Sequence, residues 1–198
     1  MSRKLTLPDI ADLREYERER PEFRARVIDL KKRRRVGVGP FVTVLFENRE
    51  TIRFQIQEMA RVEKLFTDEA IETELRVYNP LIPEPGELAL TLFIELTSEL
   101  ALRDWLPRLV GIERSLELRL GSDDPIVVPC IPDEDHQEQL TRDEITASVH
   151  YIHFRLDADQ IEAFAAGPVE LALTHPAYEH ATVLGPDTVA ELLTDLRG

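Results

Sequence analysis

Short apolar strand patterns alternate with capped helix patterns from Glu87 onward, and this alternation limits the possible folds more than any other feature of the sequence. Every second residue is apolar from Leu88 to Leu96, and a helix pattern then runs to Pro107. The same order returns in residues 149–175. Two strand–helix–strand units of this kind predict a twisted mixed sheet with helices mainly on one face.

Further elements of this half follow from the same periodicities. Strand patterns cover residues 88–96, 116–120, 126–130, 149–156 and 169–175, and helix patterns cover residues 97–106, 157–166 and 188–196.

The first 80 residues are predicted to be mainly helical, with one strand. Thr6 is expected to cap a first helix, and Pro21, a residue favoured at the first helical position, is expected to begin a second. The second helix should end in the basic run 31–35, whose cations would meet the negative end of the helix dipole in solvent. Glycines and a proline in residues 37–40 should then stop the helix.

One strand and two further helices are predicted in the rest of this half. Residues 41–46 are apolar and β-branched, which is typical of a strand. Residues 50–57 fit both a helix and a strand; a helix over residues 50–65 is favoured because the helical spacing continues past the alternating stretch. Another helix is predicted over residues 68–77, before a proline.

Chain length sets the expected domain organisation. A chain of 198 residues is long enough for one well-buried core. Residues 1–198 are therefore predicted to form a single α+β domain, with a mainly helical half at residues 1–80 and a sheet-rich half at residues 81–198.

The net charge of −14 is unevenly distributed. Residues 1–35 contain 12 lysines and arginines against 7 acidic residues, whereas the remaining 163 residues contain 12 against 31. Phosphate binding needs a broad positive face, so nucleic acid is not expected as the main partner.

Apolar segments and cysteine usage indicate a cytoplasmic protein. The longest mainly apolar stretch, Leu88–Leu96, is too short to span a bilayer, and the first residues show no signal-peptide pattern. The single cysteine, Cys130, excludes an intrachain disulfide and a four-cysteine iron–sulfur cluster held by this chain alone.

The densest group of polar side chains follows the predicted strand at residues 41–46. Its members combine opposite charges with amides: Glu47, Asn48, Arg49, Gln55, Gln57, Glu58 and Arg61. Three- and four-residue spacing places Gln55, Glu58 and Arg61 on one helix stripe. The group is either a functional site at a strand-to-helix corner or a set of surface ion pairs.

Two histidines extend the apolar faces of predicted strands. Imidazoles with carboxylates suit iron, manganese or zinc, so a possible metal site is predicted from Glu47, Glu58, His150 and His175. The alternative is that each histidine is hydrogen-bonded in the core. If the polar group is a site, we expect one connected network beside a pocket that also reaches Asn79 or one of the two histidines.

Several short motifs are distributed over nearly the whole chain. They are Phe46-Glu47-Asn48-Arg49, Gln55-Ile56-Gln57-Glu58-Met59, Tyr78-Asn79-Pro80, Val110-Gly111-Ile112-Glu113, Ser148-Val149-His150 and His175-Pro176-Ala177-Tyr178. Together they resemble the signature of an uncharacterised family of bacterial proteins described only as a domain of unknown function.

The resemblance implies a context of rubrerythrin-like and iron–sulfur oxidoreductase proteins. It therefore implies an accessory or interaction protein of a cytoplasmic redox system, with a redox protein as its partner. The residues themselves leave open a metal-dependent enzyme or metal-binding protein with Glu and His ligands. No Walker loop, GxGxxG, HExxH, CxxC or GxSxG motif is present, so the sequence does not decide whether the chain is an enzyme.

Overall fold

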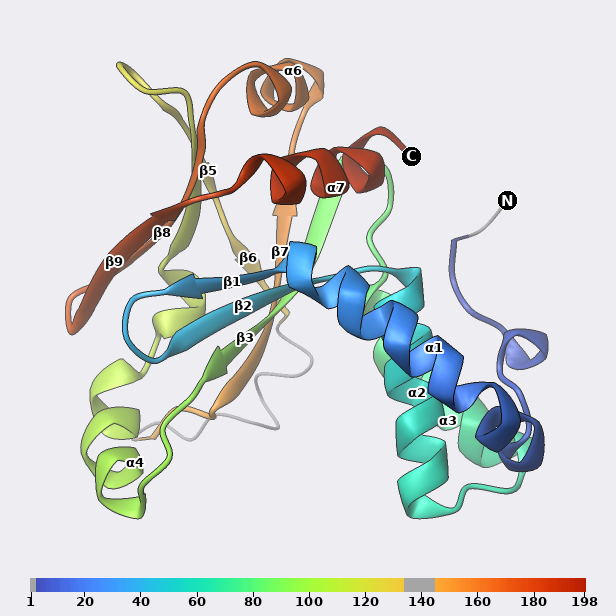
Figure 1. The fold of residues 1–198 in the computed structure, drawn as a ribbon. Coiled ribbons are helices and arrows are strands. Elements are labelled where there is room, and N and C mark those ends of the chain that lie inside the picture. Colours follow the sequence, from blue (N-terminus) through green and yellow to red (C-terminus); the bar gives the residue numbers. More distant parts are fainter. Residues whose placement is uncertain (1–2, 134–144) are drawn as a thin grey trace.

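The computed structural model describes residues 3–133 and 145–198, and its helices and strands form an α+β fold, as predicted (Figure 1). The first elements are α1 (Leu13–Arg34), β1 (Arg35–Val38), β2 (Val42–Glu47), α2 (Arg49–Glu63) and α3 (Asp68–Tyr78). The later elements are β3 (Glu87–Ile94), α4 (Glu99–Trp105), β4 (Leu116–Leu120), β5 (Ile126–Pro129), β6 (Ile131–Pro132), β7 (Val149–Arg155), α6 (Ala158–Ala166), β8 (Val169–His175), β9 (Tyr178–Val183) and α7 (Pro186–Arg197).

The described strands form two sheets. One has the order β1-β2-β3-β7-β6 and the other the order β5-β4-β8-β9, and every pairing in the described residues is antiparallel. The predicted strand–helix–strand segments are present, but β3–α4–β4 and β7–α6–β8 each connect one sheet to the other. Two antiparallel sheets therefore replace the expected mixed sheet, because periodicity identifies a strand without identifying its neighbour.

The main core lies between the two sheets. Alternate residues of β3 from Leu88 to Ile94 are at most 4% exposed and form one cluster with residues of β4 and β8, such as Leu118 and Leu171. Burying one such side chain contributes about 1.5–3 kcal/mol relative to leaving it in water. All six residues of β2 are buried, which means that both faces of this strand are covered.

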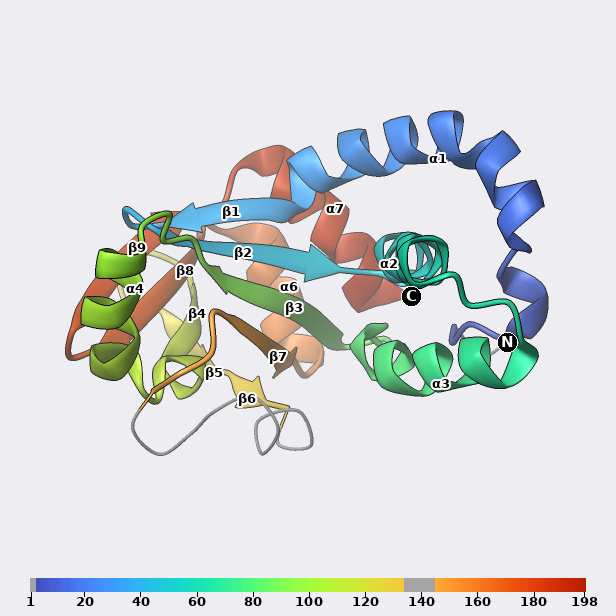
Figure 2. The same ribbon diagram turned by 90° about the horizontal axis from the view of Figure 1, so that it is seen from below.

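Helix α1 is continuous, and the predicted break at Pro21 is absent. Asp12 caps α1, whereas Thr6, the predicted cap, precedes a short 3-10 helix, Leu7–Asp9, and its amide donates to the Asp9 carboxylate at 2.8 Å. Pro21 lies inside α1, where a proline removes one amide donor and crowds the preceding turn. The helix bends markedly along its length in Figure 2, as expected of a helix that contains a proline.

The basic run 31–35 differs from the predicted solvated helix end. Arg34 is fully buried, and its guanidinium lies 2.7 Å from the carboxylate of Asp195 on α7. Arg35 begins β1, so the helix ends before the expected stop signals at residues 37–40, which instead belong to a β-hairpin. The first half therefore contains two strands, not one. The prediction was wrong for Arg34 because its partners lie at the far end of the chain.

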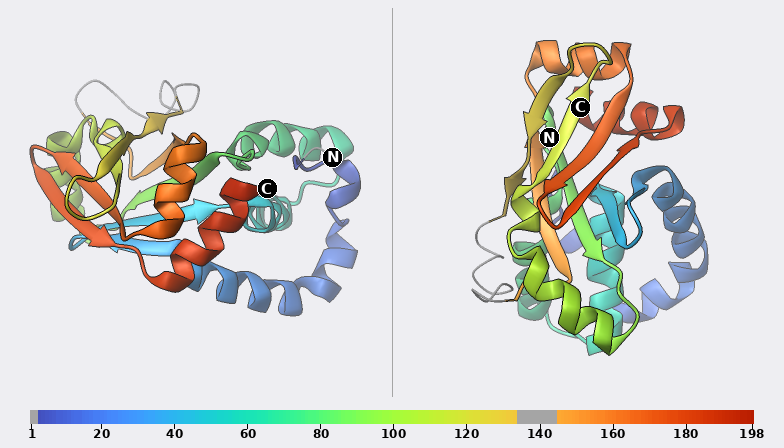
Figure 3. Two further views of the ribbon diagram at one scale, coloured as in Figure 1. Left: turned by 90° about the horizontal axis from the view of Figure 1, so that it is seen from above. Right: turned by 90° about the vertical axis from the view of Figure 1, so that its left-hand side faces the viewer.

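The helices lie at the ends of the sheets and beside one face. α6 and α7 pack together at one end, and α4 lies at the other (Figure 1). α2 and α3 extend beyond the ends of β2 and β3, and α1 arches over them (Figures 2 and 3). The C-terminal α7 contacts both α1 and β3. Within the described ranges, no helix combines the length and apolar character needed to cross a bilayer.

Candidate functional site

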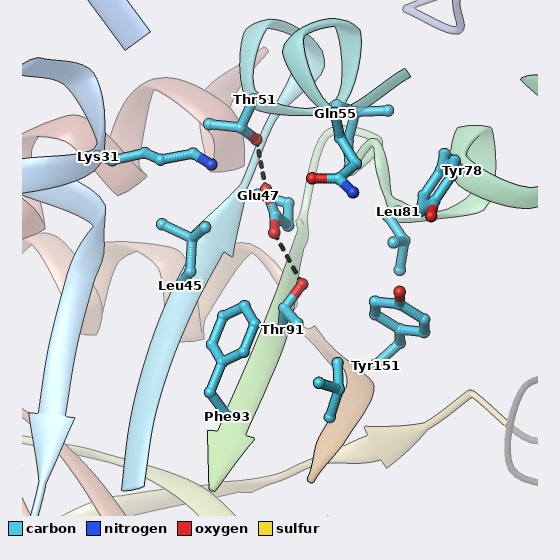
Figure 4. Close-up of a pocket in the computed structure, with 12 residues that line it drawn as sticks. Lys31, Leu45, Glu47, Thr51, Gln55, Tyr78, Leu81, Thr91, Phe93 and Tyr151 are labelled. Carbon is cyan, nitrogen blue, oxygen red and sulfur yellow. Dashed lines mark hydrogen bonds between the residues drawn. The ribbon is translucent and has the colours of Figure 1, made fainter. Parts of the chain in front are cut away.

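A cavity of about 230 Å³ lies against β2, β3 and β7 on the face of the sheet opposite the main core (Figure 4). We call it the Glu47 pocket. Its lining residues are Lys31, Leu45, Glu47, Thr51, Ile52, Gln55, Tyr78, Leu81, Thr91, Phe93, Val149 and Tyr151. Leu45 pairs with Thr91 and Thr91 with Tyr151, so these three form a row across neighbouring strands. The alternation that fills the core on one face therefore lines the pocket on the other.

Glu47 is the central acidic group of the pocket. It ends β2 and is only 7% exposed, and each carboxylate oxygen accepts one threonine hydroxyl, from Thr51 at 2.5 Å and from Thr91 at 2.7 Å. The positive end of the α2 dipole lies beside it, because Asn48 is the N-cap of that helix. In the described part of the chain, no lysine, arginine or histidine nitrogen lies within 4.0 Å of this carboxylate.

Side chains from four different segments surround Glu47. Lys31 comes from the last turn of α1 and extends toward Glu47 (Figure 4). Gln55 projects into the pocket from α2, and Tyr78 lies beyond it at the end of α3. Tyr151 projects from β7 below Tyr78. The pocket thus offers one cation, one anion and several neutral hydrogen-bonding groups to whatever enters it.

Both tyrosines are held in their neutral form. Burial raises the pKa of Tyr151 to about 12, and the charge on Glu47 adds to this effect. Burial also raises the pKa of Tyr78, and the neighbouring Gln55 amide opposes this shift. At neutral pH these phenols are therefore hydrogen-bonding groups and not bases.

Glu58 and Arg61, predicted to belong to the same site, face α1 instead of the pocket. The Glu58 carboxylate accepts hydrogen bonds from Tyr16 at 2.7 Å and from Arg20 at 2.7 and 3.0 Å. The hydrogen bond from Arg20 is the main cause that lowers the pKa of Glu58, and burial opposes it. Arg61 pairs with Glu17 at 2.7 Å. These contacts fasten α1 to α2.

Two amide side chains that were predicted to belong to the site, Asn79 and Gln57, bind the backbone of residues 5–11 instead. The Asn79 side chain accepts from the Leu5 amide at 2.8 Å and donates to the Leu5 carbonyl at 2.9 Å. Gln57 accepts from the Ala11 amide at 2.8 Å and donates to the Ala11 carbonyl at 3.1 Å. Each side-chain amide therefore pairs with both the N–H and the C=O of one backbone residue, which are the groups that a neighbouring β-strand would bind. Their role in the structure is to hold residues 5–11 against α2 and α3.

Asn48 and Arg49 have structural contacts as well. The Asn48 side chain accepts from the amides of Glu50 and Thr51 at the start of α2. Arg49 pairs with Asp9 at 2.5 Å. The predicted polar group therefore divides: Glu47 and Gln55 line the pocket, and the other members anchor α1 and the N-terminal segment. It is not one network around the pocket.

The two histidines lie in different sheets, with separate partners. On β7, His150 Nε2 hydrogen-bonds the Thr146 hydroxyl at 3.0 Å and the Ala147 carbonyl at 2.9 Å, and burial lowers its pKa. On β8, His175 Nε2 hydrogen-bonds the Val110 carbonyl at 3.1 Å. Neither histidine lines the Glu47 pocket.

The predicted metal ligands do not converge. Glu47, Glu58, His150 and His175 have the separate partners given above. Across residues 3–133 and 145–198, no three His, Cys, Asp or Glu side chains are grouped so that they could hold a metal ion.

Several pocket residues were not predicted from the sequence. The basic run contains Lys31 without marking it as a site residue, and Thr91 and Tyr151 belong to none of the predicted polar groups. The available signal was strand alternation: if Leu90 and His150 face the core, then Thr91 and Tyr151 face away from it. No local sequence pattern predicts that α1 brings Lys31 to this same face of the sheet.

Comparison with known proteins places the chain in a family. A sequence profile described as "Protein of unknown function (DUF3501)" matches residues 4–196. The chain belongs to the DUF3501 family. This membership confirms the resemblance seen in the sequence motifs.

The DUF3501 chain also resembles a solved structure. It is similar to a crystal structure described as a novel protein of unknown function from Burkholderia pseudomallei K96243, with 40% sequence identity and a TM-score of 0.88. The match covers 98% of this DUF3501 chain and 99% of the other. A search of curated proteins found no significant match.

Proposed function

We propose that this protein binds a small polar molecule in the Glu47 pocket and acts as a ligand-binding accessory protein. One observation carries the proposal: the Glu47 carboxylate is 7% exposed, accepts hydrogen bonds from two threonine hydroxyls and from no other side chain of residues 3–133 and 145–198, and borders a cavity of about 230 Å³. A cavity of this size accommodates a metabolite smaller than most drug-like ligands, whose pockets measure about 300–1,000 Å³.

The energetic cost of this arrangement supports a binding role. Keeping an ionised carboxylate out of water costs several kcal/mol unless a partner compensates it. The threonine hydroxyls and the α2 dipole compensate part of the cost, but they bring no full positive charge. A ligand that completes the hydrogen bonding of Glu47 would offset the rest.

The lining chemistry favours binding over the metal-dependent alternative. Glu47 is the only acidic residue among those that line the pocket, and none of these residues is a histidine or cysteine. Tyr78 and Tyr151 keep their protons at neutral pH because burial raises their pKa values. These groups suit recognition of hydrogen-bonding atoms.

Filling the cavity tests the proposal. A library of small metabolites is screened by thermal shift and isothermal titration against the wild-type protein and Val149→Phe, which places a ring in the pocket. We expect at least one compound to bind the wild type and to lose affinity in Val149→Phe. Val183→Phe, at a position 59% exposed on β9, is the matched control. Equal binding by all three proteins, or no binding to the wild type, would contradict the proposal.

We extend the proposal to the cellular role implied by the family resemblance, a cytoplasmic accessory protein of a redox system. Support comes from Cys130, the single cysteine, whose pKa is raised by burial. A thiol of this kind is a poor redox group, so electrons would have to be carried by a partner. Titration with a rubrerythrin-type diiron protein tests this role. A complex that weakens with added salt is expected from the acidic composition, and no complex at low salt would refute it.

A further inference from the structure

Two opposite charges face the same cavity. Among the residues that line the Glu47 pocket, Lys31 is the one basic residue and Glu47 the one acidic residue. They come from different elements, α1 and β2. In Figure 4 the Lys31 side chain extends toward Glu47 from one side, and Gln55 and the two tyrosines lie on the other.

Lys31 differs from the other members of the basic run. Lys32 pairs with Asp29, Arg33 with Asp29 and Glu191, Arg34 with Glu191 and Asp195, and Arg35 with Glu95. For Lys31, the contact shown in the described residues is with the ring of Phe54, whose centroid lies 5.5 Å from the ammonium nitrogen. No carboxylate of the described chain lies within 4.0 Å of this ammonium.

Glu47 is the complementary case. It is a buried carboxylate without an ion-pair partner in the described ranges, and Lys31 is the basic residue that lines the same pocket. The two groups do not form an ion pair with each other. Within the described residues, an acidic and a basic side chain that do not pair with a protein charge therefore border the same cavity.

We propose that the ligand of the Glu47 pocket is a small zwitterion of the amino-acid type. Its ammonium group binds the Glu47 carboxylate, and its carboxylate binds the Lys31 ammonium. This inference rests on the proposed binding function and specifies its ligand class. Each contact is a charge-assisted hydrogen bond, which is about twice as strong as a neutral one.

The neutral lining fits the same ligand. Leu45, Phe93 and Val149 provide an apolar wall for the carbon chain between the two charged groups. The ring of Tyr151 and the amide of Gln55 provide further contacts for an ammonium group. A compound with only one charge would leave either Lys31 or Glu47 unpaired beside it.

A matched series of ligands tests the inference. The probes are ω-amino acids of increasing length (β-alanine, 4-aminobutyrate and 6-aminohexanoate), α-amino acids, and single-charge analogues such as butylamine and butyrate. Binding is measured by isothermal titration at neutral pH. We expect at least one zwitterion to bind about tenfold or more tightly than its matched amine and its matched acid, because each analogue loses one charge-assisted contact.

Substitutions then assign each end of the ligand. Glu47→Gln keeps the shape of the side chain and Lys31→Met keeps most of its length, and each should weaken zwitterion binding about tenfold or more. Lys31→Met should not weaken binding of butylamine, which has no carboxylate for Lys31 to bind. Lys32→Met is the matched control, since Lys32 pairs with Asp29 on the solvent side of α1. If Glu47→Gln does not fold, the Lys31→Met measurement alone still decides the carboxylate end.

The outcomes separate this inference from the proposed function. A neutral or singly charged compound that binds more tightly than every zwitterion, and loses affinity in Val149→Phe, would overturn the zwitterion and leave the binding role intact. Unchanged zwitterion affinity in Lys31→Met would also overturn it. If no compound binds in a way that depends on Val149, both proposals fail.

Discussion

The guanidinium of Arg34 and the carboxylate of Asp195 form a buried ion pair, 2.7 Å apart, that joins the end of α1 to α7. Their side chains are 1% and 8% exposed. Arg34 also donates to Glu191 at 3.2 Å and lies 3.4 Å from the carbonyls of Phe46 and Glu47. One guanidinium therefore connects the end of α1 and the C-terminal helix α7 with β2, the strand that carries Glu47.

Removing Arg34 should destabilise the fold strongly. Arg34→Met leaves Asp195 buried without its main partner, and we expect a loss of roughly 3–5 kcal/mol in the free energy of unfolding. Urea denaturation provides the measurement. Lys32→Met, at a side chain 70% exposed, should cost at most about 1 kcal/mol. Equal costs for the two substitutions would show that the Arg34 ion pair contributes nothing.

Glu58 should make stability depend on acid pH. Its pKa is lowered below the usual 4.5, mainly by the hydrogen bond from Arg20 and despite opposing burial. Between the folded and unfolded pKa values the unfolded chain binds more protons, so this contribution is complete above about pH 4.5 and is lost as pH falls through the folded pKa. We expect Glu58→Gln to lose roughly 1–3 kcal/mol at neutral pH, and its difference from wild type to shrink on acidification.

The matched control for Glu58 is an exposed glutamate. Glu99 pairs with Arg103 on α4, and both side chains are nearly 80% exposed. Glu99→Gln should change the free energy of unfolding by about 1 kcal/mol or less at neutral pH. A difference between Glu58→Gln and wild type that stays constant from neutral to acid pH would contradict the assigned role of the carboxylate charge. Retained ligand binding in Glu58→Gln is expected, since Glu58 does not line the pocket.

Cys130 should react slowly with thiol reagents in the folded protein. Burial is the main cause that raises its pKa, and the charge of Glu113 adds to it. Its thiol also donates to the Glu113 carbonyl at 3.3 Å. Because the thiolate is the reactive species, we expect alkylation at least about tenfold slower than in the urea-unfolded chain at mildly alkaline pH. Cys130→Ser should bind ligand normally. Equal labelling rates in the two states would contradict the buried environment.

Local patterns predicted most of the individual elements. The alternation of Leu88, Leu90, Leu92 and Ile94 marks β3 because one face of that strand is core, and the helix favoured over residues 50–65 is α2. Sheet membership could not be read from these patterns, since it depends on which strands pair. β9 also escaped detection, because most of its residues are exposed and its apolar alternation is weak.

The candidate site was predictable only in part. Glu47 and Gln55 stand out because a polar group directly follows a buried strand. Lys31 gives no such signal, because it lies in a run of cations and its orientation depends on how α1 crosses the sheet. The buried state of Arg34 is equally non-local, since the carboxylate that stabilises it is 161 positions away along the chain.

Gly39 and Tyr178 connect the two sheets and give the final prediction. Gly39, in the turn between β1 and β2, has a φ of +78°, and a Cβ at this position would lie 2.5 Å from the Tyr178 hydroxyl. That hydroxyl donates to the Val38 carbonyl at 2.8 Å and accepts from the amides of Phe41 and Val42 at 3.2 Å. The close approach therefore requires glycine.

Gly39→Ala should destabilise the protein much more than Gly121→Ala, the matched control. Gly121 also has a positive φ, +95°, but a Cβ there would meet nothing within 4 Å, so only the backbone cost of about 1–2 kcal/mol applies.

Tyr178→Phe should cost roughly 1–3 kcal/mol, because two amides and one carbonyl lose their partner. The Tyr178→Phe substitution removes the hydroxyl that a Cβ at position 39 would meet at 2.5 Å. The other clash of this Cβ, at 2.6 Å, is with the exposed His180 side chain, which can move away. Gly39→Ala should therefore cost less in Tyr178→Phe than in wild type, as measured by a double-mutant cycle in urea. Strictly additive costs would show that Gly39 is required only for its backbone conformation.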